Sequence, residues 1–577
     1  MKKSLSILLT AALLAGCTPN ASDSAASKTL TGTSRGMNGE VTATVTVTNG
    51  KITDVKLDQK ETYGVGQGLP TSPVEAMPAQ IIDNQSLNVD TIAGATITSN
   101  AVLGAVEDAV KDELDVEKLK KTEVKAENGA ESYETDVVVV GAGAAGMSAA
   151  ITAQENGAKV LVLEKQGIIG GATTLSGGKL IAAGTKYQEE QGYTGDTPEA
   201  LFDYLKSIGG DYLDDEKVKF FCDHALEDVN WLEDLGVEII NVEPIHSSIT
   251  PWRVMNTKGG GGQTNGHGGQ ITVPLYDKLA STDAEIVYNA HVTGITTEDG
   301  KVTGVTGEYK DGSKFTVKAK QVILATGGYA QNREMTAYLG IENYSTTVPK
   351  GNIGEGITMG EDVGAQVYQA PGIQEVFVSY TCGVGINEES GLIVNDKGER
   401  VVDEFTYQSH VATALHKSGA QLGYYIASAE DPNETVQYGI SMEDTLSADT
   451  PEELAKLMGV DPSTFADTVA RYNELCDKGT DDDFGKPAEY MQKLEGKLYA
   501  IQLNPSYTVT FGGLVTDIDS HVLDANNQPI DGLYAAGETA FTGMFGDEYP
   551  SCGVAIGSSV RFGKMAGLNA AKAVKGE

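Results

Sequence analysis

The sequence predicts an α/β protein in which a Rossmann-like domain follows a smaller α+β domain. Residues 136–163 show the order strand, glycine-rich turn, helix and strand that is typical of a βαβ unit. Well before this unit, two runs of alternating apolar and polar residues are joined by Asn49-Gly50, a strong hairpin signal. A chain of 577 residues has room for three or four domains at roughly 150 residues each.

Composition excludes several classes of protein. Hydrophobic residues make up 40% and charged residues 21% of the chain, so neither a disordered chain nor a polytopic membrane protein is expected. The formal net charge of −39 would repel phosphate backbones, which argues against nucleic-acid binding. Cys222, Cys382, Cys476 and Cys552 are widely scattered, a pattern that favours buried, inert thiols over a metal site or a disulfide framework.

The first 34 residues predict export and membrane anchoring. Lys2 and Lys3 precede an apolar run at residues 5–14, which is typical of a secretory signal peptide and too short to span a bilayer. The Leu-Ala-Gly-Cys sequence that follows resembles a bacterial lipoprotein box, which implies that residues 1–16 are removed and Cys17 is lipidated. An ordinary signal peptide with a cysteine nearby is the alternative.

Residues 17–34 are rich in Ser, Thr and Ala and predict a flexible tether. With Cys17 lipidated, this tether would hold the protein to the outer face of the cytoplasmic membrane without spanning it. The predicted small domain follows at residues 35–115. Its expected strands and helices are residues 40–48, 51–57, 77–85 and 102–114.

Residues 90–96 read Asp-Thr-Ile-Ala-Gly-Ala-Thr and resemble the attachment signature of covalent FMN-binding domains. The resemblance implies that a dedicated flavin transferase links FMN to Thr96 through a phosphoester bond, with Thr98 as the second choice. A helix starting after the motif would offer backbone N–H groups to the phosphate. Ala93 departs from the signature, which usually has Ser or Thr there. An ordinary strand, turn and helix with a Ser or Thr N-cap is the alternative.

A charged linker is expected at residues 116–134, and the βαβ unit follows it. Gly141 would make the turn, Gly143 would let a pyrophosphate approach, and Gly146 would let the helix pack on the strand. Glu164 ends the second strand at the position that binds a ribose. Strand, helix and acid in register therefore predict a dinucleotide site.

Four segments resemble the flavoprotein superfamily of fumarate reductase and succinate dehydrogenase, which binds FAD. They are residues 164–178, 322–328, 532–538 and 553–559, in the order of that superfamily. The resemblance implies non-covalent FAD in a domain made of residues 135–370 and 506–577, with an α+β capping domain inserted at 371–505. Besides the residues of the βαβ unit, it implies FAD contacts at Ala144, Ala145, Lys165, Gly171, Ala172, Thr173, Ser176, Gly177, Gly178, Val292, Ala325, Thr326, Gly327, Gly328, Gly537, Glu538, Ala555 and Ile556.

The sequence offers no evident nicotinamide site. The glycine run at residues 259–262 lacks a flanking strand and helix, so it reads as a loop. Electrons are therefore expected to come from a membrane donor and to reach FAD through FMN.

The arginines and histidines with which fumarate reductases hold a dicarboxylate are missing. Gln408 occupies the position of the proton-donating arginine, and residues 507–513 lack the expected histidine. A site without arginines binds dicarboxylates poorly, so fumarate is not the expected substrate.

Tyr549-Pro550-x-x-Gly553 instead resembles a segment of the 3-ketosteroid dehydrogenases of the same superfamily. That resemblance implies that Tyr549 and the amide of Gly553 hold a ketone oxygen, and that Tyr407 exchanges the proton at the α-carbon. The alignment at Tyr407 is off by one, so Gln408 is the alternative there. For Tyr549 the alternative is an aromatic side chain packed beside the flavin.

Other candidate residues carry less weight. His246, Trp252, Arg253 and His267 are expected near the pocket entrance. His410 and His416 are expected on the surface or in the core of the capping domain, and Asp481, Asp482 and Asp483 on a solvated surface without metal-ligand spacing.

The sequence thus predicts an exported ene-reductase whose substrate is a small-molecule alkene, with a neutral enone such as a 3-ketosteroid as the best match. The first alternative is reduction of a monocarboxylic acrylate such as urocanate or a cinnamate, for which Arg253 or Arg333 would have to bind the carboxylate. The second alternative is an electron-transfer flavoprotein without a substrate of its own.

Overall fold

The computed structural model describes residues 27–61, 72–89, 91–92, 95–122, 124, 129–259, 267–379 and 391–577. The predicted signal peptide, Cys17 and Cys382 lie outside these ranges. Contacts divide the chain into two units. The first comprises the described parts of Met1–Glu61, Val74–Val89 and Ile97–Val124, and the second consists mainly of Lys125–Glu577.

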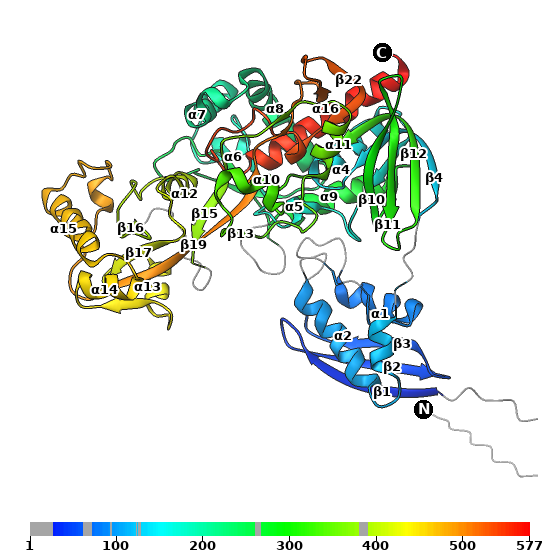
Figure 1. Cartoon of the computed structure of the whole chain (residues 1–577), viewed down its shortest axis with the longest axis horizontal. Coiled ribbons are helices and arrows are strands. Elements are labelled where there is room, and N and C mark those ends of the chain that lie inside the picture. The colour runs from blue at the N-terminus through cyan, green and yellow to red at the C-terminus, as the bar shows by residue number, and fades with distance from the viewer. Residues whose placement is uncertain are drawn as a thin grey trace, which may run out of the picture. The chain divides into compact units, whose positions relative to one another are not determined.

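The first unit is an antiparallel three-stranded sheet packed against helices (Figure 1). Its elements are β1 (Ser27–Arg35), β2 (Glu40–Thr48), β3 (Lys51–Asp58), α1 (Pro73–Asn84), α2 (Thr96–Val110) and α3 (Val116–Lys121). Asn49 and Gly50 have positive φ angles of 51° and 74°, as the Asn-Gly hairpin requires. Val41, Val45, Val102 and the other apolar residues that face the helix–sheet interface are buried. The predicted hairpin and both predicted helices are therefore present.

Strand β1 occupies residues that we expected in the flexible tether. Residues 27–35 pair with β2 along their whole length, from Ser27 opposite Thr48 to Arg35 opposite Glu40. The prediction was wrong for residues 27–34 because Ser and Thr suit either a tether or an exposed strand, and only the partner strand decides. The predicted linker is also shorter, since α3 begins at Val116 and β4 (Ser132–Val140) begins at Ser132.

A parallel sheet flanked by helices forms the core of the second unit. In the order β10-β11-β12-β4-β5-β9, strands β12, β4, β5 and β9 run parallel, and β22 extends the parallel part beside β12. The remaining bounds are β5 (Val160–Leu163), β9 (Glu285–Val287), β10 (Ala290–Glu298), β11 (Lys301–Tyr309), β12 (Lys314–Leu324) and β22 (Pro529–Ala535). Helices α4 (Ala144–Glu155) and α16 (Val554–Lys575) pack so closely that a Cβ on Gly563 would lie 2.3 Å from the Ala145 carbonyl oxygen.

The predicted capping domain contains a second, smaller sheet. Its long strand β19 (Leu498–Thr510) pairs with β13 (Ser345–Thr346), β15 (Ile373–Val378), β17 (Gly423–Ser428) and β18 (Leu446–Ala448), and β17 pairs with β16 (Leu392–Asn395). Helices α12 (Gln408–Lys417), α13 (Glu434–Ile440), α14 (Pro451–Met458) and α15 (Pro462–Lys478) accompany it. Because β19 continues past residue 505, one strand joins the two predicted domains (Figure 1).

One acidic side chain expected at the surface is buried in this region. The Asp481 side chain is 0% exposed, and Arg400 donates to it at 2.7 Å, whereas Asp482 and Asp483 remain partly exposed. The expectation of three solvated carboxylates was therefore wrong for Asp481, because a distant arginine compensates its charge. Among the described residues, no helix is both long and apolar enough to cross a bilayer.

Candidate active site

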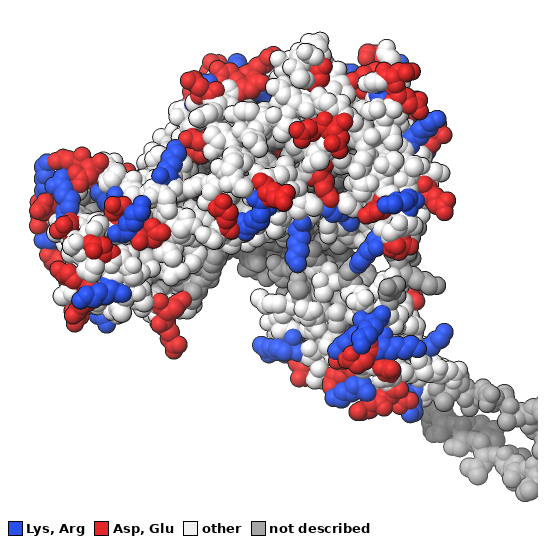
Figure 2. Space-filling view, in the orientation of Figure 1, with Lys and Arg blue, Asp and Glu red and all other residues white. Residues whose placement is uncertain are grey.

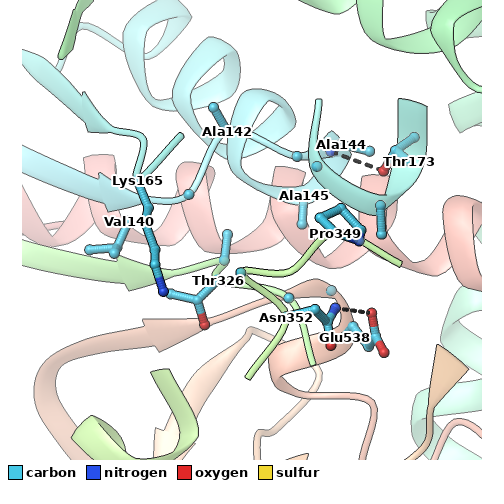
Figure 3. A pocket seen from close by; sticks show the side chains of 18 of the residues that line it. Val140, Ala142, Ala144, Ala145, Lys165, Thr173, Thr326, Pro349, Asn352 and Glu538 are labelled. Carbon is cyan, nitrogen blue, oxygen red and sulfur yellow. Dashed lines mark hydrogen bonds between the residues drawn. The ribbon is translucent and has the colours of Figure 1, made fainter. Parts of the chain in front are cut away.

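A large cavity opens at the carboxyl ends of the parallel strands, where the sequence places FAD. It has an empty volume of about 1190 Å³, part of it open to solvent. Figure 3 shows that it is bordered by the turn after β4, the start of α4, and segments around Thr326, Pro349 and Glu538. Predicted FAD contacts that line it are Gly141, Gly143, Ala144, Ala145, Glu164, Lys165, Gly171, Ala172, Thr173, Ser176, Val292, Ala325, Thr326, Gly327, Gly537, Glu538, Ala555 and Ile556.

The glycines of the first turn leave room where a pyrophosphate would lie. Gly143 is the N-cap of α4 without a side-chain cap, and a Cβ there would meet nothing closer than the Gly170 carbonyl oxygen at 3.9 Å. Gly143 therefore leaves open space at the start of α4, where an anion can approach a helix N-terminus, although the Ala144 amide already donates to the Thr173 hydroxyl at 3.4 Å. The residues present fit a dinucleotide such as FAD.

Four predicted contacts shape the walls of this cavity but do not line it. A Cβ on Gly146 would lie 1.9 Å from the Gly141 carbonyl oxygen, and a Cβ on Gly328 would lie 2.0 Å from the Thr510 hydroxyl. Gly177 and Gly178 lie beyond the lining, where Gly178 adopts φ +62° against the backbone of His267. Gly146, Gly178 and Gly328 thus allow close packing around the cavity, whereas a Cβ on Gly177 would meet nothing within 4 Å.

Two carboxyl groups line the cavity, that of the buried Glu164 and that of the partly buried Glu538. Glu164 accepts hydrogen bonds from the Ala142 and Gln166 amides at 2.8 and 2.7 Å, which fixes it at the end of β5. Glu538 accepts from the Thr510 amide and hydroxyl at 2.8 and 2.7 Å. Burial raises the pKa of both carboxyl groups, although these hydrogen bonds oppose the rise. Both can accept further hydrogen bonds, as the ribose and ribityl hydroxyls of a flavin nucleotide need.

Several polar residues of the lining could not be predicted from the sequence. Asn352 donates to Glu538 at 3.1 Å, and Glu355 accepts from Lys165 at 2.5 Å and contacts a ring nitrogen of His291 at 2.8 Å. They come from a loop after β13, the start of α11 (Glu355–Asp362), and β10. No motif surrounds them, so only the folded chain brings them together.

Two tyrosines proposed for substrate chemistry bind neighbouring backbone groups. The Tyr407 hydroxyl accepts from the Cys552 amide at 3.1 Å, and the Tyr549 hydroxyl accepts from the Ala555 amide at 3.3 Å. Ala555 itself lines the FAD cavity. Since each hydroxyl oxygen accepts an N–H, its own proton points away from that amide. Among the described residues, the only further hydrogen-bonding partner of the two hydroxyl groups is the Cys552 sulfur, 3.5 Å from the Tyr407 oxygen. Cys552, expected to be inert, thus lies at this site.

Both tyrosines stay protonated at neutral pH. Burial raises the pKa of Tyr549, and burial followed by the neighbouring Cys552 raises the pKa of Tyr407, in both cases above the ordinary value near 10. Gly553 follows in the same segment with φ +92°, and a Cβ there would lie 2.5 Å from the Leu180 carbonyl carbon. It is the N-cap of α16 and provides no side-chain cap, and of the first amides of this helix that of Ala555 donates to Tyr549.

The two arginines that could bind a substrate carboxylate are already engaged. The buried Arg253 forms a bidentate pair with Asp196 at 2.9 and 2.7 Å. Arg333 donates to the carbonyl oxygens of Ile341 and Tyr344 and to the Tyr507 hydroxyl. Among the described residues that line the cavity, the cationic side chains are those of Lys165 and, when protonated, His291. His246, Trp252 and His267, expected near the entrance, likewise do not line the cavity.

In the first unit, one of the two candidate attachment residues is buried. Thr98 is 1% exposed and donates its hydroxyl to Glu61, which also accepts from the amides of Asn38 and Met37 at 2.7 and 3.1 Å. A hydroxyl held in this way is not accessible to a transferase. Thr96 begins α2, and its side chain lies outside the described part of the chain.

Comparison with known proteins agrees with both predicted flavin domains. Residues 136–556 match the FAD binding domain family, and residues 36–111 match the FMN-binding domain family. The chain is 33% identical over 465 residues to fumarate reductase (cytochrome) of Shewanella frigidimarina, covering 78% of this chain and 80% of the relative. It is 30% identical over 601 residues to urocanate reductase of Eggerthella lenta, covering 97% of this chain and 96% of the relative.

A solved structure is similar over the second unit. The 3-ketosteroid-Δ4-(5α)-dehydrogenase of Rhodococcus jostii, in complex with 4-androstene-3,17-dione, is 27% identical with a TM-score of 0.66. The match covers 76% of this chain and 97% of that chain. Similarity therefore extends both to reductases named for carboxylates and to an enzyme crystallised with a neutral enone.

Proposed function

The chain belongs to the fumarate reductase family of flavoproteins, whose flavin-dependent enzymes reduce carbon–carbon double bonds, and on this premise we propose that its substrate is a neutral enone. The family places FAD in the second unit and FMN in the first. A 3-ketosteroid is the best match for the enone. The observation that carries the proposal is a pair of protonated tyrosines beside the cavity, with both candidate arginines engaged elsewhere. Neither tyrosine lines the cavity itself, but the Tyr549 hydroxyl is bonded to the amide of Ala555, which does.

The chain's own residues would polarise the enone and deliver the proton. Reduced FAD, when bound, supplies the hydride to the β-carbon. Tyr549, whose oxygen is held by the Ala555 amide, would donate its proton in a hydrogen bond to the ketone oxygen, together with the Gly553 amide. Tyr407, held by the Cys552 amide, would protonate the α-carbon. In both steps the donor is oriented by a backbone N–H before the substrate binds.

A monocarboxylic acrylate is the competing substrate, favoured by the similarity to urocanate reductase over nearly the whole chain. Its carboxylate would need a cation, yet Arg253 is neutralised by Asp196, and Arg333, which keeps its charge, already donates to two carbonyl oxygens and a tyrosine hydroxyl. Recruiting Arg253 would leave the buried Asp196 charge unpaired, which costs several kcal/mol, about 3–5 by comparison with other buried pairs. Fumarate has two carboxylates and would need a cation for each of them.

The supply of electrons is part of the proposal. FMN, attached to Thr96 by a flavin transferase, would receive electrons from a membrane donor and pass them to FAD. Lipidation at Cys17 would keep the protein on the outer face of the cytoplasmic membrane. These statements are supported by the sequence motifs at residues 14–17 and 90–96 and by the FMN-binding domain match.

A dye assay tests the substrate class. FAD- and FMN-loaded protein is mixed with reduced viologen and, separately, with 3-ketosteroids, urocanate, cinnamates and fumarate, and dye oxidation is followed. We expect oxidation with the ketosteroids and little with the carboxylates. Oxidation by carboxylates alone would disprove the enone assignment, and oxidation by none of the compounds would favour a pure electron-transfer role.

In the same assay, Tyr549→Phe should lower kcat about 10²- to 10³-fold because it removes a donor to the developing oxyanion. FAD content should stay that of the wild type. Tyr438→Phe is the matched control, since Tyr438 lies on α13 and is 55% exposed. An unchanged kcat for Tyr549→Phe would remove this residue from the mechanism.

A further inference from the structure

Three contacts join one cap helix to the segment that carries Tyr549. At the start of α12 the Tyr407 hydroxyl accepts from the Cys552 amide at 3.1 Å. Nδ1 of His410 lies 2.9 Å from the Glu548 carboxylate, and Nζ of Lys417 lies 2.8 Å from the Asp547 carboxylate. The three partners therefore come from residues 547–552, which we call the substrate segment.

The spacing of these contacts follows the geometry of a helix. His410 and Lys417 are seven residues apart, almost two turns, so they project from the same face of α12. The Glu548 side chain is only 11% exposed, whereas that of His410 is 53% exposed. The substrate segment thus holds its carboxylate in a fixed place, and the histidine reaches it from the solvent side.

The first residue of the substrate segment, Asp547, also packs closely on the chain that enters the cap. A Cβ on Gly372 would lie 2.4 Å from the Asp547 carbonyl oxygen. This region and α12 therefore approach the segment from different parts of the cap. A shift of α12 away from Glu548 would also move Tyr407 away from Cys552, because both contacts belong to one rigid helix.

We propose that His410 and Glu548 are positioning residues whose ion pair latches α12 onto the substrate segment and so holds Tyr407 and Tyr549 in place for the reaction. The role assigned to the two tyrosines rests on the proposed function, whereas the latch itself rests on the contacts alone. Because the latch contains a histidine, its strength depends on pH.

The charges around the latch set the direction of this dependence. His410 faces Glu548 from the substrate segment, Asp403 from the chain before α12, and Lys417 from its own helix, while Glu548 also faces Tyr204 of α7 (Pro198–Gly209). The hydrogen bond to Glu548 raises the pKa of His410 above its ordinary value near 6.5, although burial and Lys417 oppose the rise.

A pKa that is raised in the latched form means that protonation stabilises the latch. The latch is therefore complete below the ordinary pKa of a free histidine and is lost as pH rises through the raised pKa. The Lys417–Asp547 pair contains no histidine and continues to tie α12 to the segment across this range.

Amide hydrogen exchange tests the latch without a substrate. In the flavin-loaded full chain, corrected for intrinsic rates, protection of residues 408–417 should fall about three- to fivefold between pH 6 and pH 9. In His410→Gln and in Glu548→Gln it should be low at both pH values. His521→Gln is the matched control, because Nδ1 of His521 lies 3.0 Å from the Asp517 carboxylate in a similar pair outside the cap. This variant should retain the wild-type pH dependence. Equal pH dependence in all four proteins would overturn the latch.

Turnover then tests the positioning role. With the alkene identified in the dye assay, kcat/KM of the wild type should fall over the same pH range in which the protection of α12 falls. In His410→Gln, kcat/KM should be low and should change less with pH. If His410→Gln loses the protection of α12 but keeps the wild-type pH profile of turnover, the positioning role is overturned. If the exchange data behave as expected and no alkene is reduced, the latch stands and the proposed function fails.

Discussion

Thr98 and Glu61 form a buried pair that decides between the two candidate attachment residues for FMN. Burial would raise the pKa of Glu61, but hydrogen bonds from Thr98, Asn38 and Met37 outweigh it and lower that pKa. A carboxylate this well bonded is a fixed acceptor for the Thr98 hydroxyl. Glu61, which follows β3, thereby links Thr98 in the first turn of α2 to the amides of the turn between β1 and β2, so the Thr98 hydroxyl has a structural role.

Substituting the two threonines should separate attachment from stability. We expect Thr96→Val to abolish covalent FMN, seen as loss of the flavin mass increment and of in-gel fluorescence, with an unchanged melting temperature of the apo protein. Thr98→Val should retain FMN and destabilise the first unit by about 1–3 kcal/mol, because Glu61 loses a buried partner. FMN lost from Thr98→Val and kept in Thr96→Val would reverse the assignment.

At the scale of elements, α4 shows how one glycine motif serves two purposes. Gly146 lets the helix touch the turn below it, since a Cβ would lie 1.9 Å from the Gly141 carbonyl oxygen. Gly143 has no such neighbour and faces the cavity. Packing and cofactor binding are thus assigned to different positions of the same turn.

Alanine substitutions should separate these two purposes. Gly146→Ala should lower the free energy of unfolding of the apo protein by about 1–3 kcal/mol, because it overpacks the helix–turn contact. Gly143→Ala should leave apo stability nearly unchanged and weaken FAD about tenfold or more, because the methyl group would occupy the pyrophosphate face. Urea unfolding and flavin titration provide the two measurements, and a stable Gly146→Ala protein with normal FAD affinity would contradict the assignment.

The same elements explain how far the sequence could predict the site. The sequence predicts the roles of Gly141, Gly143, Gly146 and Glu164, because these roles depend on the local order of residues along one βαβ unit. Asn352 and Glu355 enter the cavity through contacts with residues far away in the sequence. The same holds for β1, whose partner strand identifies it, and for Asp481, whose burial depends on Arg400. Local patterns thus predict turns and helices, while burial of a polar group depends on distant partners.

At the scale of the whole molecule, we expect the net charge to act on the choice of substrate. The chain carries 81 acidic and 42 basic residues, and loss of Lys2 and Lys3 with the predicted signal peptide would leave a net charge of −41. Figure 2 shows acidic side chains spread over the visible surface with basic ones between them. Such a field lowers the local concentration of anions unless a basic pocket focuses them, and both candidate arginines are engaged elsewhere.

A matched pair of substrates tests this effect. Methyl cinnamate and cinnamate have the same carbon skeleton around the alkene, but only the acid is charged. The ester is also the more activated alkene, so the salt dependence of their kcat/KM ratio, rather than the ratio itself, reports the electrostatic contribution. We expect the ester to be reduced about tenfold faster or more at about 0.02 M salt, and the ratio to shrink by about 0.5 M salt, where the Debye length has fallen to roughly 4–5 Å. The rate with the neutral ester should hardly respond to salt. A preference for the acid that weakens with added salt would instead show that a cationic pocket binds the carboxylate, because screening reduces attraction and repulsion alike.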